Sequence, residues 1–260
     1  MTTLRRRMLR GGVVAGWCAV PSPFLAETMA CSGFDAITVD LQHGLQEYGH
    51  AVSLLQAIDG RGVPVMCRVP WNEPGILMKV LDAGFSGVIC PLVNTRREAE
   101  ALVQACYYPP MGGRSFGPYR AAVTAGPDYF ERANDWIVVL PMIETAQAVE
   151  NLEDILAVPG ISGVYIGPND LALSMGLPPQ LVPPNLVPAA PVLEKILAVL
   201  ATVRAAGKFA GIACGSPTMV SQMLRAGFHL ATLCSDFHFF RTGMNTLLGE
   251  TRAAIAQASS

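Results

Sequence analysis

Two carboxylates, Glu144 and Asp170, each follow a run of apolar residues typical of a buried strand. Glu144 ends the segment IVVLPMIE and Asp170 ends GVYIGPND, and a separation of 26 residues suits a strand, a helix and a second strand. The two side chains would then converge at one end of a parallel sheet. Burying two carboxylates together is costly unless a positive charge lies between them, and a hard divalent cation with oxygen ligands is the simplest candidate. The pair therefore indicates metal-assisted chemistry.

The elements that must position this pair form a repeating pattern. Short apolar runs, each followed by an amphipathic stretch, indicate strand–helix units and a parallel sheet. The predicted strands are residues 13–20, 36–41, 63–69, 87–92, 137–144, 163–167, 208–214 and 230–235. Eight such units in 260 residues predict an α/β protein with one closed (β/α)8 TIM barrel, a single domain over 1–260 in which residues 1–11 are a flexible N-terminus.

Two segments rich in Gly and Pro, residues 108–135 and 177–191, are longer than a minimal barrel requires. We expect both to be loops that follow strands. Loops of that kind usually build the rim of an active site or a subunit contact.

The composition favours a soluble protein with a large core. The chain is 51 % hydrophobic and 15 % charged with a net charge of −2, so it offers no basic surface for nucleic acid, and no apolar run reaches the length of a membrane helix. Its seven cysteines form no CxxC pair, which predicts reduced core thiols and a cytoplasmic protein. The early arginines also resemble a twin-arginine export signal, but cleavage there would remove the first predicted strand.

Polar residues at the carboxyl ends of barrel strands usually carry the chemistry. Besides Glu144 and Asp170, these positions hold Asp40, Gln42, His43, Arg68, Ser235 and Asp236, and Asp82 lies late in the helix after the third strand. Each has a structural alternative: the acids as helix caps or turn residues, His43 as a structural histidine, and Arg68 in a structural ion pair. Together they indicate a metal site, an anion clamp and a base. With no Cys or His at ligand spacing, Mg²⁺ or Mn²⁺ is favoured over zinc, and Co²⁺ should substitute.

Five segments in order resemble the HpcH/HpaI aldolase family over about residues 13–250: FDAITVDLQHG, RVPWNEPGILMKVLDAGFSGVICPLVN, YYPPMGGRSFGP, PMIETAQAVENL and GVYIGPNDLALSMG. The resemblance implies a metal-dependent class II pyruvate aldolase, with a barrel of the phosphoenolpyruvate/pyruvate type, that cleaves 4-hydroxy-2-oxo acids. It also implies a homo-oligomer, a trimer or hexamer, in which the last helix is exchanged between neighbouring subunits.

The resemblance assigns a role to each matching residue. It makes Glu144 and Asp170 the metal ligands, Arg68 the contact to the keto oxygen of pyruvate, His43 the catalytic base, Asp82 its dyad partner, and the backbone at Gly167 and Pro168 the site for the pyruvate carboxylate. Many relatives have Glu-His followed shortly by Pro, whereas this chain has Gln42-His43-Gly44. The acidic neighbour of the base is therefore neutral here.

Three other readings compete. A Schiff-base aldolase is disfavoured because Lys79 and Lys195 fall in predicted helices and Lys208 begins a strand, at the wrong end of a barrel. A citramalyl- or malyl-CoA lyase of the same superfamily would need cations for CoA, such as Arg114, Arg120 and Arg132. A non-catalytic binding or assembly barrel has no physical reason to keep buried opposing charges.

Overall fold

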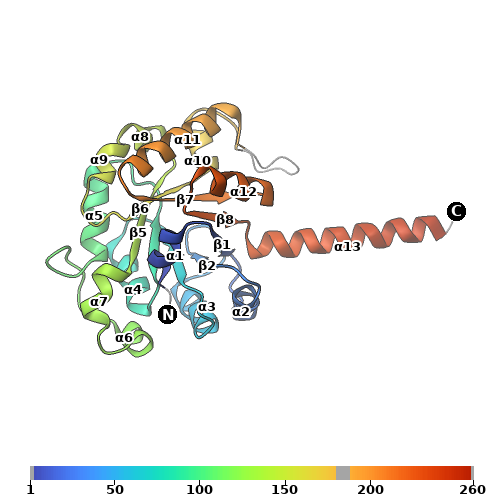
Figure 1. Cartoon of the computed structure of the whole chain (residues 1–260). Coiled ribbons are helices and arrows are strands. Elements are labelled where there is room, and N and C mark those ends of the chain that lie inside the picture. Colours follow the sequence, from blue (N-terminus) through green and yellow to red (C-terminus); the bar gives the residue numbers. More distant parts are fainter. Residues whose placement is uncertain (1–2, 180–187, 259–260) are drawn as a thin grey trace.

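Eight parallel strands close into one barrel in the computed structural model, which describes residues 3–179 and 188–258 (Figure 1). The strands are β1 (Val13–Cys18), β2 (Ala36–Asp40), β3 (Val65–Arg68), β4 (Gly87–Cys90), β5 (Val138–Ile143), β6 (Gly163–Ile166), β7 (Phe209–Cys214) and β8 (Leu230–Leu233). Each strand pairs with the next along the chain, and β8 pairs with β1 to close the ring. The predicted (β/α)8 barrel and all eight predicted strands are confirmed.

The helices form an outer layer around the barrel (Figure 1). They are α2 (Pro23–Cys31), α3 (Tyr48–Ile58), α4 (Pro74–Ala83), α5 (Arg96–Cys106), α8 (Ala146–Glu150), α9 (Leu152–Leu156), α10 (Pro168–Ser174), α11 (Ala190–Ala205) and α12 (Pro217–Ala226). Helix α5 begins with a capping box in which Thr95 accepts from the Glu98 N–H and the Glu98 side chain accepts in return. Apolar side chains between strands and helices make the larger core, and a second cluster fills the barrel interior.

A short helix closes the amino-terminal end of the barrel. Helix α1 (Leu4–Arg10) buries Leu4 and Met8 completely against the interior cluster. Arg5 donates hydrogen bonds to the backbone carbonyls of Asp135 and Ile137. The prediction of a flexible N-terminus is therefore corrected for this helix, because its apolar face covers the open end of the barrel.

The segment 107–136 lies at the amino-terminal end of the barrel, not at its mouth. It follows α5 and leads into β5 through α6 (Tyr119–Ala125) and α7 (Tyr129–Trp136), so it connects a helix to a strand. Figure 1 shows α6 and α7 on the side of the barrel away from the C-terminal helix. The expectation of a rim loop after a strand is wrong for this segment. Most of the second segment, 177–191, lies outside the described residues.

The three arginines considered for CoA binding are engaged at that same end. Arg114 pairs with Asp82, Arg120 with Asp59, and Arg132 with Asp128. These arginines therefore give no support for a CoA site at the mouth of the barrel.

The C-terminal helix α13 (Asp236–Ala258) leaves the barrel and projects into solvent (Figure 1). Among its residues only Asp236 is buried. Large apolar side chains are exposed along it: Phe237, Phe239, Phe240, Met244, Leu247, Leu248 and Ile255. Within the described ranges, no helix is both long and apolar enough to cross a membrane.

Candidate functional site

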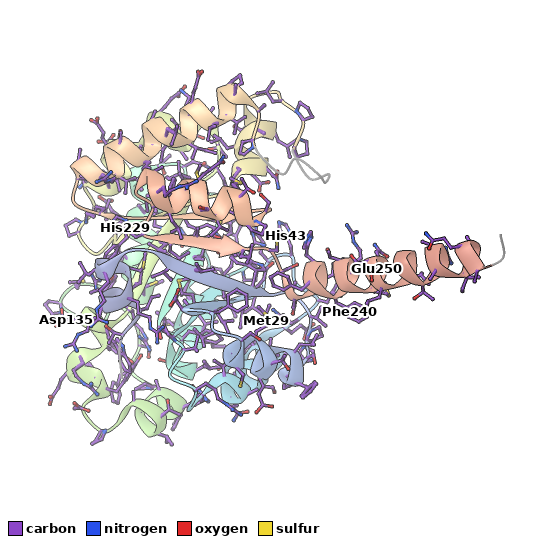
Figure 2. All side chains as sticks on the ribbon, turned by 45° about the vertical axis from the view of Figure 1, so that its right-hand side comes forward. Met29, His43, Asp135, His229, Phe240 and Glu250 are labelled. Atoms are coloured by element: carbon purple, nitrogen blue, oxygen red, sulfur yellow. The ribbon has the colours of Figure 1, made fainter. Side chains whose placement is uncertain are left out.

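A cavity of about 420 Å³ opens at the carboxyl ends of the strands. Among its lining residues are His43, Arg68, Gly167, Pro168 and Asp170. These five come from the ends of β2, β3 and β6, which lie far apart in sequence and are gathered by barrel closure. Figure 2 shows His43 near the base of α13, and Asp135 and His229 toward the opposite end of the barrel. The structure thus brings together most of the residues that the sequence singled out.

Glu144 follows β5 and lies directly behind Gly167, with only 2 % of its surface exposed. The Leu92 N–H donates to its Oε1 at 2.8 Å, and Leu92 itself has a left-handed φ of 53°. A Cβ atom at position 167 would lie 2.6 Å from the other oxygen, Oε2, so glycine keeps the space beside it open. Among the described residues Oε2 has no hydrogen-bond donor.

The charge environment of Glu144 is unusual for a carboxylate. Burial raises its pKa to about 7, and the negative charge of Asp170 adds to the rise, while the Leu92 N–H and the charge of Arg68 oppose it. Asp170 stands in the first turn of α10, which begins at Pro168 after Gly167. Two neighbouring carboxylates, one with a free oxygen, suit a hard cation that takes its remaining ligands from substrate and water. No group of three His, Cys, Asp or Glu side chains in the described ranges could hold a metal by itself.

The raised pKa of Glu144 predicts a pH-dependent stability of the metal-free protein. The carboxyl of Glu144 has a pKa of about 7 in the folded protein and an ordinary value of 4.5 in the unfolded chain, so the folded state holds the proton more tightly. Its contribution to stability is therefore fully present below pH 4.5 and is lost as the pH rises through about 7. We expect a loss on the order of 3 kcal/mol over that window. This loss is measured by thermal unfolding of the unaltered protein and of Glu144→Gln, both in EDTA, from pH 5 to 8. A difference between the two proteins that does not change with pH would contradict the prediction.

Arg68 is held by Asp40 in a two-point ion pair. Its Nε and Nη2 donate to the two carboxylate oxygens at 2.8 and 2.6 Å. The Trp17 indole N–H donates to Asp40 at 3.2 Å, and the guanidinium lies over the Trp17 ring at 4.8 Å. Burial alone would raise the pKa of Asp40, but the hydrogen bonds and charge of Arg68 outweigh it and hold that pKa below its ordinary value. The structural ion pair considered for Arg68 is therefore present.

Asp40 also fixes the turn that carries His43. The backbone N–H groups of Gln42 and His43 donate to its Oδ1, at 3.0 and 3.3 Å. Gln46 closes the turn by donating to the Asp40 carbonyl at 2.9 Å. The His43 side chain is exposed, and its imidazole has no hydrogen-bond partner in the part of the chain that the structure describes. One carboxylate thus orients both the arginine and the histidine turn.

The predicted His43–Asp82 pair is not formed within this chain. Asp82 stands in the last turn of α4, which leads into the start of β4, so it lies at the amino-terminal end of the barrel. There it accepts a hydrogen bond from the buried Arg114 at 2.6 Å. The reason is helix direction, since a barrel helix carries the chain back from the mouth to the opposite end.

The first turns of α13 form the other side of the cavity, which Ser235, His238 and Arg241 help to line. Asp236 does not line it, because its carboxylate accepts from the N–H groups of Ala19 and Val20 and from its own helix at Phe237. Asp236 is therefore a structural cap, as one of the alternatives held.

No lysine lines the cavity in the described ranges. Lys208 donates instead to the Ile161 carbonyl at 2.7 Å, before β6 begins. The undescribed segment 180–187 has no lysine in its sequence. This arrangement is unsuited to a Schiff-base mechanism.

Sequence reasoning missed the role of Trp17, which lines the cavity and contacts both members of the Arg68–Asp40 pair. The available signal was an indole near the carboxyl end of the first strand. From the sequence pattern alone, such a residue is interpreted as part of the core, because its sequence neighbours do not show that its ring contacts an arginine two strands away.

The fold is a TIM barrel, and the candidate site lies at the carboxyl ends of its strands, where enzymes of this fold carry their active sites. The model of the HpcH/HpaI aldolase/citrate lyase family matches residues 15–242, and the chain belongs to this family. It is 39 % identical over 240 residues to a hydroxypyruvate/pyruvate aldolase of Rhizorhabdus wittichii, covering 92 % of this chain and 94 % of that protein. It is 32 % identical to a 5-keto-4-deoxy-D-glucarate aldolase of Salmonella arizonae, covering 89 % of each.

A solved structure supports the same placement. A HpcH/HpaI aldolase/citrate lyase family protein from Burkholderia cenocepacia superposes with a TM-score of 0.87 at 29 % identity, covering 97 % of this chain and all of that one. The chain is accordingly a lyase of the aldolase type.

Proposed function

We propose that this chain is a divalent-metal-dependent aldolase that reversibly cleaves 4-hydroxy-2-oxo acids to pyruvate and an aldehyde. The observation that carries the proposal is the buried Glu144, which keeps one oxygen free near Asp170 and directly behind Gly167, a residue that lines the same cavity as Arg68. These residues would hold Mg²⁺ or Mn²⁺, and Co²⁺ would substitute. The names of the relatives, pyruvate and 2-oxo sugar-acid aldolases, point to the same substrate class.

Each residue has a part in the proposed retro-aldol cleavage. When bound, the cation polarises the 2-oxo group and offsets the negative charge that develops on its oxygen. Arg68 donates to the same oxygen, and the chain at Gly167 and Pro168, where α10 begins, receives the carboxylate. His43 removes the proton of the C4 hydroxyl, the C3–C4 bond breaks, and its electron pair passes to C3 as the aldehyde leaves. Protonation of C3 then yields pyruvate.

His43 acts in this proposal without Asp82 from its own chain. Its exposed imidazole is free to reach a substrate hydroxyl, directly or through water. No hydrogen bond joins the side chains of Gln42 and His43 in the described structure. The neutral neighbour therefore changes the field at the base and not its hydrogen bonding.

Removal of the metal tests the proposal. Treatment with EDTA should abolish both pyruvate release from a 4-hydroxy-2-oxo acid and exchange of the pyruvate C3 protons with deuterium, and added Mg²⁺ or Mn²⁺ should restore both. The exchange reaction needs no aldehyde, so it reports the pyruvate half alone. Turnover that survives complete metal removal would refute the proposal.

We further propose that the chain is a single-domain cytoplasmic protein that assembles as a trimer or hexamer through α13. All seven cysteines are free thiols, which suits a reducing compartment. Phe237, Phe240, Met244, Leu247 and Leu248 are exposed along α13, and exposure of so many large apolar side chains on one helix is costly unless a second copy covers them.

A charge on the apolar face of α13 is expected to break the assembly. Leu247→Glu should lower the molar mass measured by light scattering, because it would bury an unpaired carboxylate in the contact. Thr246→Glu, on the opposite face of the same helix, is the matched control and should leave the mass unchanged. Equal masses for Leu247→Glu and the unaltered protein would show that α13 is not the contact.

A further inference from the structure

The mouth cavity has two unlike sides. Arg68, Asp170 and the chain at Gly167 form the side proposed for pyruvate. The opposite side is made by the base of α13, where His238 and Arg241 are three residues apart on one face of the helix and both line the cavity. A substrate that extends from the pyruvate side toward α13 would bring its aldehyde half to these two residues.

The cations on the two sides differ in how they are neutralised. Arg68 is paired with Asp40 through both carboxylate oxygens. Arg241 forms no ion pair with any residue in the described ranges, and its one recorded contact places the guanidinium 5.8 Å from the centre of the Phe237 ring. The nearest acid along the helix, Asp236, is already engaged by the backbone of Ala19 and Val20. The α13 side of the cavity thus presents an uncompensated positive charge.

Polar groups around Arg241 suit an anion and not a hydrocarbon. The Ser235 hydroxyl accepts from the His238 backbone N–H at 3.3 Å and keeps its own proton free to donate. The imidazole of His238 lies in a T-shaped arrangement with Phe239, and no hydrogen bond in the described ranges occupies its ring nitrogens. A guanidinium with an imidazole and a hydroxyl nearby matches the acceptor oxygens of a carboxylate or a phosphate.

We infer that Arg241, assisted by His238, is a specificity-determining residue that selects aldehydes with an anionic group on the chain beyond the carbonyl. This inference rests on the proposed function, because it assigns the second half of the same cavity. Arg241 is exposed at the rim, so solvent screens part of the attraction. The selectivity expected for a charged hydrogen bond at such a position is about 10- to 50-fold in kcat/KM.

Matched aldehyde pairs test the assignment in the synthetic direction with pyruvate and Mg²⁺. Succinic semialdehyde and butanal share a carbon skeleton and differ in one carboxylate, while D-glyceraldehyde 3-phosphate and D-glyceraldehyde differ in one phosphate. The unaltered protein should prefer the charged member of at least one pair, and which pair it is distinguishes the carboxylate from the phosphate. Arg241→Gln should lower that preference about 10-fold or more, and Arg241→Lys should retain part of it. Arg252→Gln, farther along the same helix and outside the cavity, should leave it unchanged.

Two results would overturn the assignment. One is a preference that is unchanged in Arg241→Gln. The other is a fall in kcat/KM that is equal for charged and neutral aldehydes, which marks Arg241 as structural. Deuterium exchange at C3 of pyruvate, measured in parallel, separates this failure from failure of the proposed function. If exchange is intact and the preference does not respond, only the role of Arg241 is wrong, whereas absence of exchange in the unaltered protein rejects the aldolase and the assignment together.

Discussion

Glu144→Gln is expected to lower metal-dependent turnover by about 10³-fold or more, since it removes a proposed ligand and with it much of the charge stabilisation at the oxo group. Glutamine has the same shape, and its carbonyl can still accept the Leu92 N–H that now holds Oε1. The change therefore removes a negative charge while leaving the packing of a nearly fully buried side chain in place. Titration calorimetry with Mn²⁺, together with pyruvate C3 exchange, measures the effect.

The same substitution makes a second, opposite prediction for stability. Because burial raises the pKa of Glu144 to about 7, the ionised side chain opposes folding above that pH when no metal is bound. Glu144→Gln should therefore be the more stable protein at pH 8 in EDTA and the less active one in Mg²⁺. Glu150→Gln, an exposed change on α8, is the control and should alter neither property. Unchanged Mn²⁺ affinity in Glu144→Gln would remove this carboxylate from the metal site.

The sequence predicted what depends on chain order and local pattern. Apolar runs located all eight strands, and the strand-end rule placed Arg68, His43 and Asp170 at one mouth. The prediction that Asp82 pairs with His43 failed because it ignored the direction of the helix, which carries Asp82 away from the mouth. The capping box at Thr95 marks a helix between the fourth strand and the segment 107–136. A segment that follows a barrel helix lies at the amino-terminal end of the strands, so the sequence contained the information needed to place it there.

Other features depend on contacts between distant residues, which no local pattern contains. Whether Asp40 caps a turn or pairs with an arginine could not be decided from its neighbours, and in the structure it does both. The docking of α1 likewise depends on an open barrel end that exists only after the strands close. Pattern reasoning finds the elements, whereas the connections among their side chains require the fold.

Asp40→Asn is expected to reduce kcat by roughly 10²- to 10³-fold, because Arg68 would lose the charged partner that holds its guanidinium in place. An asparagine amide nitrogen in place of Oδ2 would face two other donors, the Arg68 Nη2 and the Trp17 indole N–H. An asparagine oxygen in place of Oδ1 could still accept from the turn. The guanidinium would therefore be displaced while the backbone around it stays folded.

Stability should fall as well, and in a way that separates Asp40 from surface acids. Breaking a buried ion pair costs about 3 to 5 kcal/mol, while the exposed Asp128–Arg132 pair makes Asp128→Asn a control worth about 0 to 1 kcal/mol. Since the pKa of Asp40 is lowered in the fold, its contribution is present above the ordinary value of 3.8 and is lost as pH falls through the folded pKa. Denaturant unfolding at pH 7 and at pH 3 should therefore show a gap between Asp40→Asn and the unaltered protein that narrows in acid. A kcat within threefold of the unaltered protein, measured well below the melting temperature, would mean that Arg68 needs no anchor from Asp40, and its position during turnover would then have to be set by the substrate itself.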